Sequence, residues 1–103
     1  MIVAFSVAPS QSADASGSVS EAVAEAVRIV RASGLPNRTS SMFTELEGEW
    51  DECMAVVKQA CEAVGQHGDR VSLVLKADIR PGRTGELTGK IERLEQAIDR
   101  QER

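Results

Sequence analysis

The side chains best suited to bind a ligand lie in segments with strand-like alternation. These polar residues, set among apolar ones, are Ser6, Thr44, Glu45, Glu47, Lys76 and Asp78. A hydroxyl or carboxylate on a half-buried sheet costs free energy unless it is hydrogen-bonded, about 1–3 kcal/mol for a neutral group and more for a charge. Several such groups around an apolar patch are typical of a pocket for a small heteroaromatic molecule. For any single acidic residue, a solvated or salt-bridged strand face is the simpler interpretation.

Residue patterns for catalysis or metal binding are missing from the sequence. The single histidine, His67, lies in the glycine-flanked segment GQHGD and is interpreted as an exposed residue at a helix end. There is no phosphate-binding glycine loop, no dinucleotide fingerprint and no zinc-ligand spacing. Cys53 and Cys61 lie on one predicted helix about 12 Å apart, beyond disulfide reach, so we expect protected thiols in a reducing cytoplasm. We therefore predict a protein that is not an enzyme and that has no metal and no cofactor beyond its ligand.

Length and charge restrict the possible partners. The 103 residues are enough for one domain, 1–103, with a core built mostly of aliphatic side chains because only three residues are aromatic. The net charge of −4 argues against a nucleic-acid partner. The N-terminal segment MIVAFSVAP has neither a basic flank nor a long apolar run, so we expect no signal peptide, no membrane span and a cytoplasmic location.

The stretch SMFTELEGEWDECM, residues 41–54, places several of the candidate groups where a strand meets a helix. Alternation predicts two strand faces, with Met42, Thr44 and Leu46 on one and Phe43, Glu45 and Glu47 on the other. Gly48 interrupts the alternation, and the acidic residues after it favour a helix start. We expect Trp50, the only tryptophan, to pack at this junction and to be the first residue of the apolar stripe of the helix.

Periodicity predicts the remaining elements. The strands are expected at 2–8, 42–47 and 71–79 with a short extended segment at 35–40, and the helices at 18–34, 49–64 and from about 87 to 98. The pattern S-x-x-E at Ser18–Glu21 predicts the first helix start, and the small-residue loop 10–17 is either a plain connection or a flap over a site. This order, β-α-β-β-α-β plus a final helix, predicts an α+β ferredoxin-like sandwich, a four-stranded antiparallel sheet with two helices on one face.

The other face of the sheet needs a cover. Either the third helix, with its apolar positions Leu87, Ile91, Leu94 and Ile98, lies on it, or a second subunit does, and we favour oligomerisation. Lys76 and Asp78 are as consistent with a mutual or inter-subunit salt bridge as with ligand contact. The loop Arg80–Gly85 is interpreted as a solvated turn in preference to a phosphate site.

Four segments in order, IVAFSVAP, RIVRASGLPN, TELEGEWDECM and LVLKADIRPGRTG, carry a resemblance to a known family. The chain resembles the thiamine-binding family of small ferredoxin-like proteins over nearly its whole length. The resemblance implies a pocket near a subunit interface and dimers that pair into tetramers. Carried over residue by residue, it implies Ser6, Thr44 and Glu47 as ligand contacts. From the residues alone, Met42, Phe43 or Phe5 is expected to pack on the ligand rings. Glu47-Gly48-Glu49 matches the family motif best, whereas family members differ at Phe43 and Glu45.

The residues and the resemblance together predict a non-catalytic cytoplasmic protein that binds thiamine or its hydroxymethyl-pyrimidine moiety. Its expected partners are further copies of itself, in a dimer or tetramer, and the small-molecule ligand, with no nucleic acid and no membrane. The alternative is a structural or regulatory oligomerisation module, or a metabolite sensor, without affinity for thiamine. Co-purification of a pyrimidine with the native protein separates the two hypotheses.

Overall fold

The computed structural model describes residues 1–10 and 20–103. Its elements in chain order are β1 (Ile2–Pro9), α1 (Ser20–Ala32), β2 (Asn37–Thr39), β3 (Thr44–Glu47), α2 (Trp50–Val64), η1 (Gly65–His67), β4 (Val71–Asp78) and α3 (Glu86–Gln101). The expected cap at Ser18 and most of the expected loop 10–17 lie outside the described residues. None of the helices in the described ranges is long and apolar enough to cross a bilayer.

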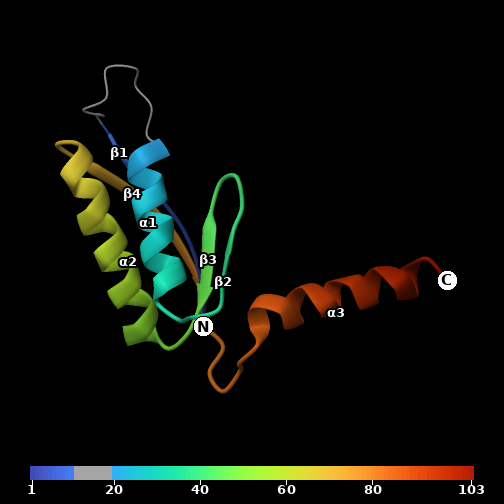
Figure 1. Ribbon diagram of the computed structural model, residues 1–103. Coiled ribbons are helices and arrows are strands. Elements are labelled where there is room, and N and C mark those ends of the chain that lie inside the picture. Colours follow the sequence, from blue (N-terminus) through green and yellow to red (C-terminus); the bar gives the residue numbers. More distant parts are fainter. Residues whose placement is uncertain (11–19) are drawn as a thin grey trace.

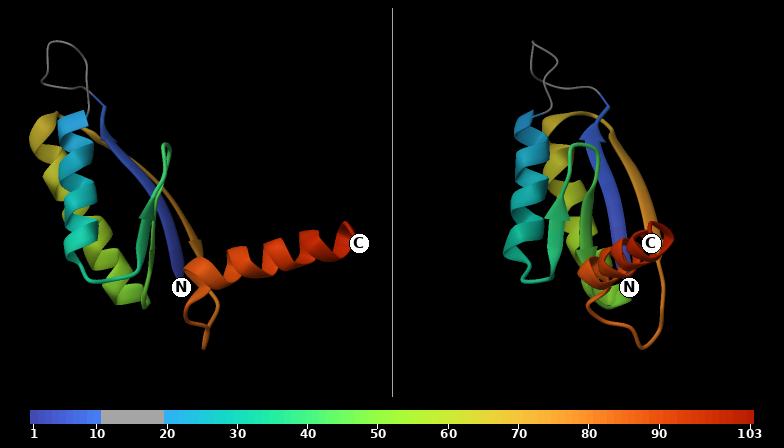
Figure 2. Two further views of the ribbon diagram at one scale, coloured as in Figure 1. Left: turned by 45° about the vertical axis from the view of Figure 1, so that its right-hand side comes forward. Right: turned by 90° about the vertical axis from the view of Figure 1, so that its right-hand side faces the viewer.

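The sheet has the ferredoxin-like arrangement that the element order predicts. Its strands are antiparallel in the order β2-β3-β1-β4, and α1 and α2 lie together on one face (Figure 1). The opposite face carries neither of these helices (Figure 2). We call this second surface the open face.

Alternation along the strands assigns side chains to the two faces. In β1, Val3, Phe5 and Val7 are buried against the helices, whereas the residues between them are half-buried on the open face. The register pairs Val3 with Leu46 and Phe5 with Thr44, so Leu46 and Thr44 face the helices as well. Glu45 and Glu47 consequently share the open face, and the alternation predicted that these two residues lie on one side of the strand.

Local signals explain how the helices begin and end. Gly34 has φ +81°, the left-handed conformation that ends α1 at little cost for glycine. At the start of α2, Glu49 and Glu52 form a reciprocal capping box, in which the backbone N–H of Glu49 donates to Glu52 Oε1 at 2.9 Å. The helix then buries five apolar side chains against the sheet: Cys53, Val56, Val57, Ala60 and Val64.

Two sequence predictions about this region need correction. Trp50 is the first residue of α2 and its side chain is 55% exposed, so it does not pack at the strand–helix junction. The strand expected from Met42 begins at Thr44, because Ser40 closes a turn with Phe43: Ser40 Oγ accepts a hydrogen bond from the Phe43 N–H at 3.3 Å, and the Ser40 N–H donates to the Phe43 carbonyl at 2.8 Å. Met42 therefore lies at the tip of the β2–β3 hairpin.

The final helix departs from the compact body. Only its first turn is buried, and the rest of α3 projects away from the sheet (Figures 1 and 2). The radius of gyration is 15.8 Å, whereas a compact domain of 100 residues has about 13 Å. The third helix therefore does not cover the open face in a single chain.

Candidate functional site

A gap in the sheet separates the tip of the β2–β3 hairpin from β1. The ladder between β1 and β3 ends at the pair Phe5–Thr44, although β1 continues to Pro9 in its pairing with β4. Beyond Phe5 the hairpin thus diverges from β1 and leaves a cavity of about 230 Å³. We call it the hairpin cavity; its walls are Phe5, Ser6, Val7, Ala8, Val23, Ala26, Val27, Thr39, Ser40, Ser41, Met42, Phe43 and Thr44.

Four of the five predicted ligand contacts come together here. Ser6, Met42, Phe43 and Thr44 all line the hairpin cavity, although they come from two strands and a turn. Thr44 is buried, Ser6 and Phe43 are half-buried, and Met42 is 74% exposed at the rim. The position of the four residues makes this cavity the candidate binding site.

The cavity is apolar with hydroxyl groups and carries no charge. Its polar side chains are the hydroxyls of Ser6, Thr39, Ser40, Ser41 and Thr44, and among the described residues that line it none is ionisable. Ser6, Val7 and Ala8 are consecutive, and consecutive strand residues point to opposite faces. A wall made of all three is therefore the edge of a strand, which presents peptide groups as well as side chains. Such a wall suits a neutral ring with donor and acceptor atoms on its edge.

Glu47, the fifth predicted contact, lies elsewhere and has another partner. Its carboxylate accepts hydrogen bonds from the backbone N–H groups of Glu86, at 2.9 Å to Oε2, and Leu87, at 3.1 Å to Oε1. Gly85, the residue that precedes α3, supplies no capping side chain, so Glu47 caps this helix from β3. The side chain is buried. The geometry therefore gives Glu47 a structural role and does not join it to Ser6 and Thr44.

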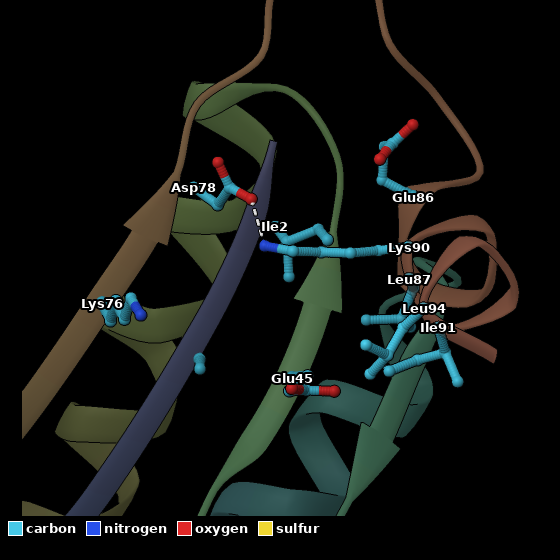
Figure 3. Close-up of a pocket in the computed structure, with 10 residues that line it drawn as sticks. Ile2, Glu45, Lys76, Asp78, Glu86, Leu87, Lys90, Ile91 and Leu94 are labelled. Atoms are coloured by element: carbon cyan, nitrogen blue, oxygen red, sulfur yellow. Dashed lines mark hydrogen bonds and ion pairs between the residues drawn. The ribbon is translucent and has the colours of Figure 1, made fainter. Parts of the chain in front are cut away.

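A second cavity of about 360 Å³ lies where α3 meets the open face (Figure 3). We call it the α3 groove; its walls are Ile2, Ala4, Glu45, Lys76, Asp78, Glu86, Leu87, Lys90, Ile91 and Leu94. Lys90 extends from α3 across Ile2 and donates a hydrogen bond to Asp78 at 2.7 Å. This interaction lowers the pKa of Asp78 below its ordinary value. A mutual ion pair of Lys76 and Asp78 is not found in the described part of the chain, because Asp78 pairs with Lys90 instead.

The first turn of α3 is also held by two ion pairs, one from within the helix and one from the loop before it. Arg93 hydrogen-bonds the carboxylate of Glu86, and Arg83 lies 3.7 Å from it. The hydrogen bond from Arg93 lowers the pKa of Glu86. Sequence reasoning missed Lys90 and Arg93, since a charged residue on an amphipathic helix is ordinarily solvated. One local signal was present for the contact of Glu47: Gly85, which has no side chain to cap α3, indicates that the cap must come from elsewhere, but it does not indicate Glu47.

The other ionisable candidates show no catalytic arrangement. His67 Nε2 lies 3.0 Å from Glu25 Oε2 at the surface, so the histidine has a partner and is only partly exposed. Cys53 is buried and Cys61 is half-buried; both are free thiols, and burial raises the pKa of each. Among the described residues no group of three histidine, cysteine, aspartate or glutamate side chains is arranged to hold a metal ion. The loop after β4 is a turn closed by the Arg83 N–H and the Arg80 carbonyl at 3.1 Å.

Comparison with known proteins gives a consistent result. The family model for thiamine-binding proteins matches residues 3–95. A UPF0045 protein of Mycobacterium bovis is 48% identical over 103 residues, which cover 99% of this chain and 98% of the relative. A hypothetical protein of Methanocaldococcus jannascii has a solved structure that is 30% identical, covers 91% of this chain and 94% of its own, and superposes with a TM-score of 0.80.

A structure from Thermotoga maritima, of a protein to which a role in thiamine biosynthesis or salvage has been attributed, is 27% identical and has a TM-score of 0.69. The match covers 84% of this chain and 91% of that one. These similarities extend over nearly the whole sequence and over the fold described above. The chain therefore belongs to the thiamine-binding protein family.

Proposed function

We propose that this protein binds thiamine or its hydroxymethyl-pyrimidine moiety in the hairpin cavity, in the cytoplasm, without converting it. The observation that carries the proposal is the composition of the cavity: five hydroxyl side chains, a strand edge and apolar walls, with no ionisable side chain among the described lining residues. General acid–base catalysis needs a titratable group within hydrogen-bond reach of the substrate. A cavity built from hydroxyl and apolar groups instead supports a binding role.

The size of the cavity favours the pyrimidine ring. Its volume of about 230 Å³ is below the range of about 300–1,000 Å³ that holds drug-sized ligands. One substituted ring fits this space better than two. The aminopyrimidine then lies between the β1 edge and the hairpin, where Phe43 packs on its face, and the thiazolium of intact thiamine stays at the rim near Met42.

We further propose that the site lies near a subunit interface in a homo-oligomer, a dimer or a tetramer. Val74 is the register partner of Ser6 on the open face, and its side chain is 56% exposed. Met42, at the rim of the cavity, is 74% exposed. Apolar surface thus continues from the mouth of the cavity onto an uncovered sheet face, and such surfaces mark sites of association.

Calorimetric titration of thiamine and of hydroxymethyl-pyrimidine tests the proposal. We expect micromolar or tighter binding of at least one of them to the wild type. Replacing Ser6 by alanine removes one hydroxyl, worth about 0.5–1.5 kcal/mol of hydrogen bonding, and should weaken binding roughly 2- to 10-fold. Ser72→Ala is the matched control, because Ser72 also lies on the open face but on β4, outside the cavity.

The absence of measurable heat with both ligands would reject the proposed function. Equal losses in Ser6→Ala and Ser72→Ala would reject the hairpin cavity as the site. The rival function, an oligomerisation module without thiamine affinity, is favoured by the exposed apolar side chains of α3. Native mass spectrometry distinguishes it: an oligomer that never carries a pyrimidine supports the rival.

A further inference from the structure

A further cavity, of about 170 Å³, lies at the other end of β1 from the hairpin cavity. We call it the tryptophan cavity; its walls are Met1, Glu49, Trp50, Ile79, Arg80, Pro81, Gly82 and Arg83. The N-terminus and the loop before α3, which both contribute to it, lie beside each other in Figures 1 and 2. The cavity joins two features of the sequence that the proposed function does not use: the only tryptophan and the arginine-containing loop after β4.

The loop holds two arginines side by side. Arg80 to Arg83 form a β-turn, in which the Arg83 N–H donates to the Arg80 carbonyl at 3.1 Å. Pro81 is the second residue of the turn and Gly82, with φ +78°, is the third, as a type II turn requires. The first and last Cα atoms of a β-turn are less than about 7 Å apart. The two guanidinium groups therefore start from neighbouring positions on a backbone that proline makes stiff.

These two cations have few anionic partners. Arg83 lies 3.7 Å from Glu86, but the same carboxylate also binds Arg93. Arg80 forms no ion pair with any of the described residues. The acidic residue of the cavity, Glu49, is already used, because its side chain accepts a backbone N–H of α2 in the capping box. Since like charges held close together repel, the cavity favours an anion, although the chain has a net charge of −4.

Apolar surface lies next to the two cations. The side chain of Trp50 is 55% exposed and that of Ile79 is 58% exposed. The Gly48 N–H donates to the Met1 carbonyl at 3.1 Å, which fixes the wall of the cavity beside the start of α2. A flat ring that stacks on Trp50 would cover part of this surface. Stacking accepts any heteroaromatic base, because every base has a π-face.

We propose that the tryptophan cavity binds a mononucleotide, with the phosphate on Arg80 and Arg83 and the base on Trp50. Guanidinium groups pair bidentately with phosphate. A phosphate monoester carries about 1.5–2 negative charges at pH 7 and three acceptor oxygens, so one such group serves both arginines. A carboxylate has only one charge and two oxygens. Binding takes Arg83 away from Glu86, which keeps its hydrogen bond from Arg93.

The size and charge of the site favour a single nucleotide. The tryptophan cavity is smaller than the hairpin cavity, about 170 against 230 Å³. It therefore encloses the phosphate and leaves the base on the exposed part of Trp50. A nucleic-acid strand is held by a row of phosphate contacts on a basic surface, whereas this cavity has two arginines in an acidic chain. The sequence alone favoured a solvated turn at Arg80–Gly85; the adjacent tryptophan is what the structure adds.

Tryptophan fluorescence tests the site directly. Trp50 is the only tryptophan and the chain has no tyrosine, so the emission reports on this cavity alone. We expect AMP to quench the emission saturably below millimolar concentration, and adenosine, which lacks the phosphate, to need at least a tenfold higher concentration. Arg80→Gln removes a charge-assisted contact and should weaken AMP binding roughly 10- to 100-fold. Arg70→Gln is the matched control, because it removes the same charge just before β4, at the far end of that strand.

Three results would overturn this assignment. They are the absence of saturable quenching by millimolar AMP, equal binding of AMP and adenosine, and equal losses in the two arginine variants. A 5′-phosphorylated oligonucleotide that binds more tightly than AMP would replace the mononucleotide by a nucleic-acid end. Trp50→Leu, followed by calorimetry, should weaken AMP binding roughly 5- to 100-fold, and an unchanged affinity would contradict stacking. Arg80 and Trp50 are exposed, so these substitutions leave the core intact.

The tryptophan cavity and the hairpin cavity can be tested separately. Met1 and Val7, one from each cavity, are six residues apart along the chain, or about 20 Å at the rise of an extended strand. Ser6→Ala should therefore leave AMP binding unchanged, and Arg80→Gln should leave thiamine binding unchanged. A protein that binds AMP but neither thiamine nor hydroxymethyl-pyrimidine would reject the proposed function alone. The reverse result would reject the nucleotide site alone.

Discussion

Replacing Glu47 by glutamine should release the first turn of α3. The carboxylate holds two buried backbone N–H groups, those of Glu86 and Leu87, one on each oxygen. Glutamine keeps the shape of the side chain but has only one acceptor oxygen. One of the two N–H groups must then lose its partner, and the helix also loses a negative charge near its N-terminus.

The structure allows the size of the effect to be worked out. A buried donor without an acceptor costs about 1–3 kcal/mol. The lost charge near the N-terminus of the helix adds about 0.3–1 kcal/mol. We therefore expect α3 docking to weaken by about 1.3–4 kcal/mol, which corresponds to a roughly 10- to 900-fold higher population of the undocked helix.

Hydrogen exchange at the amides of Glu86 and Leu87 measures this population directly. Glu45→Gln is the matched control, because Glu45 lies on the same face two residues earlier and lines the α3 groove without holding these amides. We expect fast exchange in Glu47→Gln alone, with thiamine affinity unchanged. Equal exchange in both variants would refute the capping role. A tenfold loss of ligand affinity in Glu47→Gln with undisturbed exchange would return this residue to the ligand site.

Two further predictions concern thiols and pH. Burial raises the pKa of both thiols, so a thiol reagent should label half-buried Cys61 slowly and buried Cys53 not at all in native buffer, and both quickly in denaturant; equal native rates would show that α2 is packed differently. The hydrogen bond from Lys90 lowers the pKa of Asp78 in the folded state, so the stability it contributes is present above the unfolded pKa and is lost as the pH falls through the lower folded value, below about pH 4. Lys90→Met should show a smaller drop in melting temperature between neutral pH and pH 2 than wild type, and parallel curves would contradict this assignment.

Periodicity was sufficient to predict the element order and the strand faces. The two-residue repeat through Thr44, Glu45, Leu46 and Glu47 placed each side chain on the face where it lies. This succeeded because a strand buried on one face fixes its own register. The signals that start and end the helices are also local in sequence, as the capping box at Glu49 and the left-handed conformation of Gly34 show.

The role of Glu47 and the exposure of Trp50 could not be predicted in the same way. The partners of Glu47 lie 39 and 40 residues away in the sequence. Nothing in the spacing of strand residues indicates that a helix end will arrive beside them. Trp50 matches the spacing of the apolar stripe of α2, but it is the first residue of the helix and its side chain is more than half exposed.

The open side of β1 connects the α3 groove with the hairpin cavity. Ile2 and Ala4 form the floor of the α3 groove, and Ser6 and Ala8 form one wall of the hairpin cavity. The change occurs after Phe5, where β3 stops pairing with β1. From Ile2 to Phe5 the two strands are paired and form a continuous floor beside α3. After Phe5 the edge of β1 is unpaired on the hairpin side and can contact the pyrimidine ring of the proposed ligand. One short hairpin ladder therefore creates both surfaces and separates them along β1, so a substitution that lines one of them leaves the residues that line the other in place.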